Sequence, residues 1–188
     1  MANRSYLVLQ DAPDPIDPLE DDTLAVAAAN YALPLLWVAA FRISDLRYVP
    51  RVVSDGDGVE ETMQVPVLFA RRTEAIDLFR ARREFLNGNL PPDLVVHVDE
   101  FERLLGESTA QFCLLDGFEI WCMDAPEIFI ANLGESLESF NLRTTVSWSR
   151  TLGDAGIVTE GSTFGYDPEV VRFALRGFEW SGPVPWKD

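Results

Sequence analysis

Two apolar runs flank Asp116-Gly117 in the stretch from Phe112 to Met123, and the predicted fold is organised around it. Asp-Gly between apolar runs is a strong hairpin signal, because glycine adopts the positive φ of a type I′ turn. A two-residue loop would leave Glu119, Trp121 and Met123 on an amphipathic face. The opposite face would be wholly apolar and would carry Cys113, Leu115, Phe118, Ile120 and Cys122. We therefore predict a hairpin with one face in the core.

The remaining hydrophobic pattern predicts strands and helices in irregular order. Short β-branched or alternating runs predict strands at 5–10, 47–53, 64–70, 94–98 and 143–149. Helical spacing and end signals predict helices at 24–29, 34–41, 73–86, 124–140 and 167–177, with a short helix or turn at 99–105. Strands and helices without regular βαβ alternation predict an α+β fold. We expect an antiparallel or mixed sheet whose central hairpin is packed by about four helices.

The length and charge of the chain limit the number of domains and the kinds of partner that we expect. A chain of 188 residues with 47% hydrophobic residues fits one acidic globular domain spanning 1–188. The formal net charge of −16 argues against nucleic-acid or anionic-membrane binding and favours a basic partner. Proline and carboxylates crowd 11–22, and acids with glycine crowd 54–62, so both are expected to be exposed acidic loops. The uncharged run at 23–41 contains Asn30 and Pro34, which favours two short buried elements over a membrane span.

The two cysteines and the N-terminus indicate a cytoplasmic location. In the hairpin register, Cys113 and Cys122 would share a face but lie diagonally, about 7–8 Å apart, too far for a relaxed disulfide. We expect both thiols to be reduced, buried and structural, as in a reducing cytoplasm. The N-terminus lacks the pattern of a signal peptide, because Arg4 is followed directly by a strand-like run.

Candidate chemistry centres on one histidine and one group of arginines. On a strand, His97 and Asp99 would point to the same side, so the carboxylate could orient the imidazole as a base or ligand. Arg71, Arg72, Arg80, Arg82 and Arg83 could receive a phosphate, although pairing inside this acidic protein is the simpler expectation. Nucleotide-loop, nucleophile-elbow and metal-ligand motifs are missing, so we expect no catalytic residues, cofactor or metal. A small enzyme or anionic-ligand domain using these residues remains an alternative.

A protein-binding role has circumstantial support from aromatic and acidic residues. Trp121, Trp148, Trp180 and Trp186 stand in segments that read as exposed or marginal, where aromatic side chains can anchor interfaces. The candidate partner-binding residues are Asp14, Asp17, Asp21, Asp22, Glu119 and Trp121. We expect a non-enzymatic module that captures a basic protein through charge and aromatic anchors. A structural homodimer built on the amphipathic hairpin face is a further alternative.

A short resemblance refines this expectation. The opening Met-Ala-Asn-Arg-Ser-Tyr-Leu and the later Asn30-Tyr31-Ala-Leu-Pro34 resemble the start of an uncharacterised group of bacterial proteins. Their small acidic character is similar to that of immunity proteins encoded beside polymorphic toxins. The resemblance covers about a dozen residues and carries no site residues. The immunity role it implies is our inference: a basic toxin domain would be the partner, and this protein would cover its active site.

Overall fold

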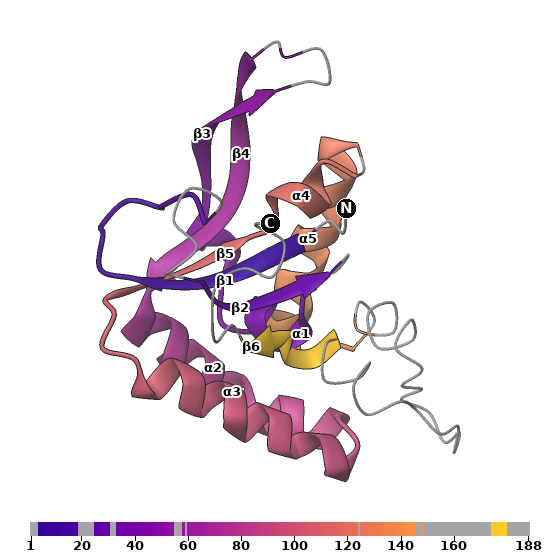
Figure 1. The fold of residues 1–188 in the computed structure, drawn as a ribbon. Helices are drawn as coiled ribbons and strands as arrows, with labels where there is room; N and C mark the ends of the chain where they lie inside the picture. The colour runs from indigo at the N-terminus through magenta and orange to yellow at the C-terminus, as the bar shows by residue number, and fades with distance from the viewer. Residues whose placement is uncertain are drawn as a thin grey trace.

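The fold is built on one antiparallel sheet (Figure 1). The computed structural model describes residues 4–18, 25–30, 33–54, 58, 60–123, 125–145, 148 and 174–179. Its six strands run in the order β3-β4-β5-β1-β2-β6, and all neighbours are antiparallel. The strands are β1 (Arg4–Gln10), β2 (Ala25–Asn30), β3 (Leu46–Ser54), β4 (Glu60–Arg71), β5 (Phe112–Asp116) and β6 (Phe178–Glu179). The predicted α+β class is confirmed.

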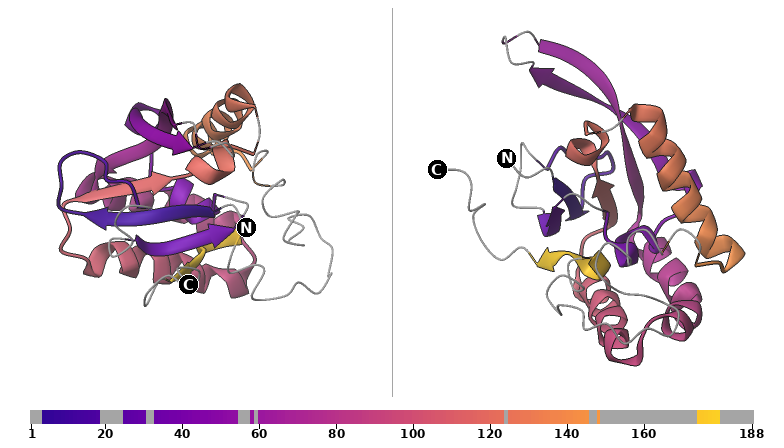
Figure 2. Two further views of the ribbon diagram at one scale, coloured as in Figure 1. Left: turned by 45° about the horizontal axis from the view of Figure 1, so that its top comes forward. Right: turned by 90° about the vertical axis from the view of Figure 1, so that its right-hand side faces the viewer.

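Helices and loops cover both faces of the sheet. The helices are α1 (Leu35–Val38), α2 (Arg72–Asn89), α3 (Val95–Glu107), α4 (Phe118–Trp121) and α5 (Pro126–Leu142), with 3-10 turns η2 (Ile43–Asp45) and η3 (Pro92–Leu94). The right-hand view of Figure 2 shows α5 on one side of the sheet, α4 on the other, and α2 with α3 at one end. Successive residues of β1, Leu7 and Val8, are both fully buried. Because they point to opposite faces, both faces of the sheet contribute to the core.

Several predicted elements are confirmed by the structure. β1 forms as expected, and the two strands predicted at 47–53 and 64–70 pair as a longer hairpin. The helix predicted at 73–86 extends over Arg72–Asn89, with Arg71 as its N-cap. The predicted apolar stripe of α5 is buried at Phe129, Leu133, Leu137 and Phe140. Its N-cap is Ala125, because Pro126 starts the helix; the expected cap, Asp124, lies outside the described residues.

The predicted central hairpin at 112–123 is wrong. β5 ends at Asp116, and Phe118–Trp121 form the short helix α4. β1 and β4 already pair with the two edges of β5, so no edge is left for a hairpin partner. The Asp116 carboxylate instead accepts a hydrogen bond from the Phe118 backbone N–H at 2.8 Å, and Gly117 has a φ of −117°. The aspartate that signalled a turn therefore starts a helix.

The alanine-rich segment predicted as a helix at 24–29 is the strand β2. Helix propensity is overridden here by pairing, because β2 supplies the partner for the open edge of β1. Ala27, Ala28 and Ala29 of β2 are buried, and α1 is a four-residue helix that is shorter than the predicted 34–41. Trp37 of α1 is fully buried and donates from Nε1 to the Arg176 carbonyl at 2.8 Å.

The segment predicted as a strand at 94–98 is the start of α3. Its buried residues, Val98, Phe101 and Leu105, recur at helical spacing over a window longer than the local Val-Val-His-Val run. Phe101 packs edge-on against Phe79 of α2, with ring centroids 5.1 Å apart. Packing against α2 therefore selects the helix over local β propensity.

The strand predicted at 143–149 is also wrong where the structure describes it. Arg143 is left-handed, with a φ of 52°, and forms the C-cap of α5. The Trp148 N–H donates to the Thr145 carbonyl at 3.0 Å, which is a helical turn. Trp148 was expected to be exposed, yet its side chain is 1% exposed between Phe85 and Phe140. Trp180 and Trp186 lie outside the described residues.

The end of the last predicted helix is confirmed at Gly177. Residues 174–176 are helical, and Gly177 has a φ of +66°. A Cβ at this position would lie 2.5 Å from the Ala28 carbonyl oxygen and 2.5 Å from the Trp37 ring. Glycine is therefore required both by backbone conformation and by close packing.

Both cysteines are free, as predicted, but only one is buried. Cys113 lies in the centre of the sheet, and burial raises the pKa of its thiol to about 12. Cys122 is exposed after α4, which corrects the expectation that the two thiols share a buried face. Burial, to a smaller extent, also raises the pKa of the Cys122 thiol.

Candidate functional site

The predicted acidic loop is partly packed against the sheet. Gln10 holds it by donating from Nε2 to the carbonyls of Ala12 and Asp14, at 2.9 and 2.7 Å. Asp14 is exposed, whereas Asp17 is half-buried and Pro18 is buried. Asp21 and Asp22 lie outside the described residues. Among the predicted binding residues of this loop that are described, Asp14 alone presents an exposed carboxylate.

Asp17 belongs to a buried cluster of charges around Arg51. The Arg51 guanidinium lies 2.7 Å from Asp17 and 2.6 Å from Asp116, and only 5% of its side chain is exposed. It also stacks 4.8 Å from the centre of the Phe118 ring. The cluster joins the 11–18 loop, β3, the end of β5 and the start of α4. Its geometry indicates a structural role, because the charges are satisfied inside the protein.

Glu119 and Trp121 are also held by the protein itself. The Glu119 carboxylate accepts a hydrogen bond from the Arg4 backbone N–H at 2.9 Å. Trp121 is 6% exposed and packs against Phe118. Burial raises the pKa of the nearby Tyr6 hydroxyl to about 12, and the Glu119 charge adds to this effect. Neither Glu119 nor Trp121 forms the open docking face that the hairpin prediction required.

His97 and Asp99 do not meet in the structure. Both lie on α3, where residues two apart point in different directions. His97 Nδ1 lies 3.3 Å from Glu100 Oε2, whereas Asp99 forms an ion pair with Arg83. The described residues therefore do not assemble the histidine–aspartate pair predicted from a strand.

The arginine group is distributed among internal partners. Arg72 donates to the carbonyls of Ala110 and Leu105, at 2.6 and 2.8 Å. Arg80 and Arg83 both bind Glu102, and the hydrogen bond from Arg80, together with Arg83, lowers the pKa of that carboxyl. These contacts match the simpler expectation of internal pairing.

Arg82 is the most buried member of the arginine group. Its Nη1 donates to the carbonyls of Ala39 and Phe41, at 2.9 and 2.8 Å, and its Nη2 donates to Asn141 Oδ1. Burial lowers its pKa to about 10, and Arg42 contributes further. Arg82 therefore connects α2 to the segment after α1 and to α5.

A surface that the sequence did not predict lies along β3 and α5. Seven large hydrophobic side chains are exposed in the described part of the chain, and Val96 on α3 is one of them. The other six lie on η2, on β3, after α4 and on α5, and we call the part of the protein that carries them the α5–β3 surface: Ile43, Tyr48, Val52, Met123, Ile128 and Leu142. η2 packs against α5, and both views of Figure 2 show α5 running beside β3 and β4. Exposed large apolar side chains on neighbouring elements are a feature of interaction sites.

The charge of α5 adds to this surface. Glu127, Glu135 and Glu138 are exposed along the helix. The sequence from Pro126 to Leu142 contains no lysine, arginine or histidine. The solvent side of α5 is therefore acidic and is bounded by exposed Ile128 and Leu142, at 48% and 64%. The sequence signal for it was available, because both residues lie off the buried stripe of α5.

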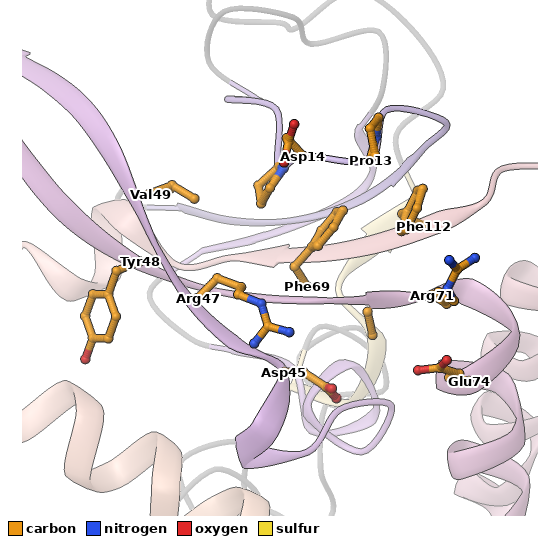
Figure 3. A pocket seen from close by; sticks show the side chains of 12 residues that line it. Pro13, Asp14, Asp45, Arg47, Tyr48, Val49, Phe69, Arg71, Glu74 and Phe112 are labelled. Carbon is orange, nitrogen blue, oxygen red and sulfur yellow. The ribbon is translucent and has the colours of Figure 1, made fainter.

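A pocket opens on the other side of β3. It has a volume of about 500 Å³ and lies between the 11–18 loop, β3 and β4 (Figure 3). Its lining is mixed: Phe69 and Phe112 are aromatic, Arg47 and Arg71 are basic, and the acids are Asp14, Asp45 and Glu74. Tyr48 and Val49 are neighbours on β3 and point to opposite sides in Figure 3. Tyr48 belongs to the α5–β3 surface and is also among the residues that line the pocket, so the two sites meet at β3.

Comparison of the chain with protein-family models, curated proteins and solved structures finds no match. No helix in the described part of the chain is long and apolar enough to cross a membrane. Within the same residues, histidine, cysteine and carboxylate side chains form no group of three that could hold a metal ion.

Proposed function

We propose that the protein is a non-enzymatic binding module whose α5–β3 surface docks onto a basic protein. The observation that carries this proposal is that six of the seven large hydrophobic side chains exposed among the described residues lie on α5, on β3 and on the segments next to them. The apolar side chains would supply contact area, and the α5 glutamates would face the partner's positive charges.

Most of the described arginines that we discuss bind groups of the same chain, and this favours a cationic partner. Arg51, Arg80 and Arg83 bind carboxylates of the same chain, and Arg72 and Arg82 bind backbone carbonyls. The 31 acidic residues outnumber the 15 lysines and arginines. The surplus negative charge attracts a basic surface and raises the rate of encounter, most strongly at low ionic strength.

In its narrowest form, the proposal is that the partner is a bacterial toxin domain and that this protein is its immunity protein. The support is the acidic character of the chain together with the resemblance of its N-terminal residues to a group of small acidic bacterial proteins. Binding would cover the toxin's active site, and the chain itself would need no catalytic residues.

The experiment is a comparison of surface variants in partner capture from the native host. Ile128→Ser/Leu142→Ser should abolish recovery of the partner, whereas Val96→Ser, an equally exposed residue on α3, should leave it unchanged. Capture should weaken as salt rises, since screening reduces the electrostatic attraction. A partner retained by Ile128→Ser/Leu142→Ser, or one indifferent to salt, would contradict the proposal.

Self-association through the same surface is the competing function. A second copy would bring another net charge of −16, which opposes dimerisation, and this favours a basic partner over a homodimer. Light scattering separates the two cases. A monomeric mass supports the basic partner, and a dimeric mass that Ile128→Ser/Leu142→Ser converts to monomer supports the homodimer.

A further inference from the structure

The pocket between the 11–18 loop and the sheet has an aromatic base. Phe69 and Phe112 stack with ring centroids 5.2 Å apart and an interplanar angle of 14°. The Arg71 guanidinium lies 5.7 Å from the centroid of Phe112, so this aromatic pair already accepts a cation within the protein. Aromatic faces attract cations because their π electrons give the ring a negative face.

The carboxylates around the pocket form fewer contacts within the protein than its arginines do. Arg47 donates from Nη1 to the Ser44 and Leu46 carbonyls, at 2.8 and 2.9 Å, and Arg71 stacks on Phe112. Asp45 accepts a hydrogen bond from the Arg42 backbone N–H, and its negative charge partly offsets the lowering of the Arg82 pKa. Asp14 and Glu74 are exposed, and within the described residues neither carboxylate forms an ion pair.

We propose that this pocket receives an arginine side chain of the basic partner, with its guanidinium on the Phe69–Phe112 pair, which Asp14 and Glu74 flank from opposite sides (Figure 3). The inference rests on the proposed function, because it names the group that the partner presents. A volume of about 500 Å³ falls within the ~300–1,000 Å³ of typical ligand pockets, so a long side chain and its flanking backbone fit. Arginine suits the site because its planar cation both stacks on rings and binds carboxylates.

An anionic ligand fits the same pocket less well. It would meet the Arg47 and Arg71 guanidiniums, but three carboxylates would surround it in a protein of net charge −16. Like charges at close range disfavour such a ligand, whereas they favour a cation. The electrostatic balance of the pocket therefore selects a guanidinium.

The test uses the full chain and small probes, and it needs no partner. N-acetyl-arginine amide is titrated into ¹⁵N-labelled protein, with N-acetyl-norleucine amide as the uncharged probe of similar length. We expect saturable shifts of the backbone amide signals of residues 14, 47–49 and 69–71 with arginine and none with norleucine. Asp14→Asn/Glu74→Gln should weaken arginine binding by about fivefold or more, as expected for two partly screened charge contacts.

A matched variant separates the pocket from general charge attraction. Asp77→Asn/Glu84→Gln removes two exposed carboxylates of α2 that do not line the pocket, and it should bind arginine like the wild type. Equal loss in the two double variants, equal shifts with norleucine, or no saturable shift would overturn the inference.

The two proposals can fail separately. Capture of a partner that depends on Ile128 and Leu142, without arginine binding in the pocket, would refute the arginine site and leave the docking surface. Arginine binding in the pocket, with capture unaffected by Ile128→Ser/Leu142→Ser, would refute the docking surface and leave the arginine site.

Discussion

At the scale of single residues, the Arg51 cluster shows how acidic residues of a loop become structural. Asp116 is 1% exposed and Arg51 is 6% exposed, so each charge depends on its buried partners. Taking a charge out of water costs several kcal/mol, and the ion pair offsets that cost only while both members are present. Asp17 extends the same contact to the 11–18 loop.

Replacing Arg51 with leucine should therefore be strongly destabilising. The change leaves the buried Asp116 carboxylate without its cation, and the free energy of unfolding should fall by about 3–5 kcal/mol. Urea denaturation measures the loss. The matched variant is Arg47→Leu on the same strand, because Arg47 is exposed and contacts only nearby carbonyls. A similar small effect in both variants would contradict the structural role of the cluster.

Gly177→Ala should be costly for a different reason. A Cβ at Gly177 would clash with the Ala28 carbonyl and the Trp37 ring, and the φ of +66° disfavours any side chain. We expect a loss of about 1–3 kcal/mol from strained backbone and displaced packing. Gly134→Ala is the control, because nothing lies within 4 Å of a Cβ there, in the interior of α5, and it should stabilise by about 0.5–1 kcal/mol. Thermal unfolding compares the two, and equal effects would contradict the prediction.

At the scale of elements, β3 and β4 form an exposed two-stranded arm beyond the end of β5. The pairing of β4 with β5 stops at Val67 and Asp116, while β3 and β4 continue to Ser54 and Glu60 (Figure 1). Pro50 has no N–H, so it occupies a position whose backbone points away from β4. It interrupts the open edge between Tyr48 and Val52.

Pro50→Thr should promote self-association of the protein through the β3 edge of the arm. Threonine would restore an outward N–H beside the exposed Tyr48 and Val52, which converts the edge into a continuous template for pairing with another chain. We expect concentration-dependent self-association in sedimentation or light scattering, with unchanged circular dichroism of the monomer. Gln64→Thr, at the exposed position opposite Pro50, serves as the control and should remain monomeric. A monomeric Pro50→Thr protein would show that the proline does not protect this edge.

The stabilisation that the contact between α2 and α3 provides depends on pH through the Glu102 carboxyl. Hydrogen bonding to Arg80 lowers the pKa of Glu102 from its ordinary value of 4.5. A carboxylate with a lowered folded-state pKa stabilises the protein above its unfolded-state value and loses that contribution as the pH falls through the folded-state value. The stabilisation is therefore present at neutral pH and decreases below pH 4.5.

Glu102→Gln should cost about 1 kcal/mol at pH 7, because Arg80 and Arg83 lose a partner that is partly screened by solvent. The difference from the wild type should shrink in denaturation curves measured below pH 4.5. Glu84→Gln, on the exposed side of α2, should have little effect at either pH. A difference that is constant with pH would contradict the linkage to the Glu102 carboxylate.

At the scale of the whole molecule, the excess of negative charge should lower the thermal stability of the protein at low salt concentration. A net charge of −16 repels itself in the compact state, and salt screens that repulsion. We expect the thermal midpoint to rise by a few degrees between low and moderate NaCl concentration. Glu127→Gln/Glu135→Gln/Glu138→Gln should show a smaller salt response, because it removes part of the repulsion. A midpoint that falls with salt would indicate that attractive ion pairs dominate.

The α+β class and the more regular elements were predictable from the sequence. The β3–β4 hairpin, the core of α2 and the buried stripe of α5 follow from side-chain periodicity alone, because burial of one face imposes that period. The acidic character is likewise a property of composition, whereas the cysteines are free for a reason other than the predicted hairpin register, because Cys113 is buried in β5 and Cys122 is exposed after α4.

The tertiary structure decided which local signals prevailed. Asp116-Gly117 became a helix start because β1 and β4 occupied both edges of β5, and the alanine segment became β2 because β1 required a partner. Val95–Val98 became helical because residues beyond that window pack on α2. The α5–β3 surface and the pocket between the 11–18 loop and the sheet also depend on the tertiary structure, since each joins residues from segments far apart in the chain. The sequence by itself determined periodicity and charge, whereas long-range packing decided pairing, exposure and the candidate binding sites.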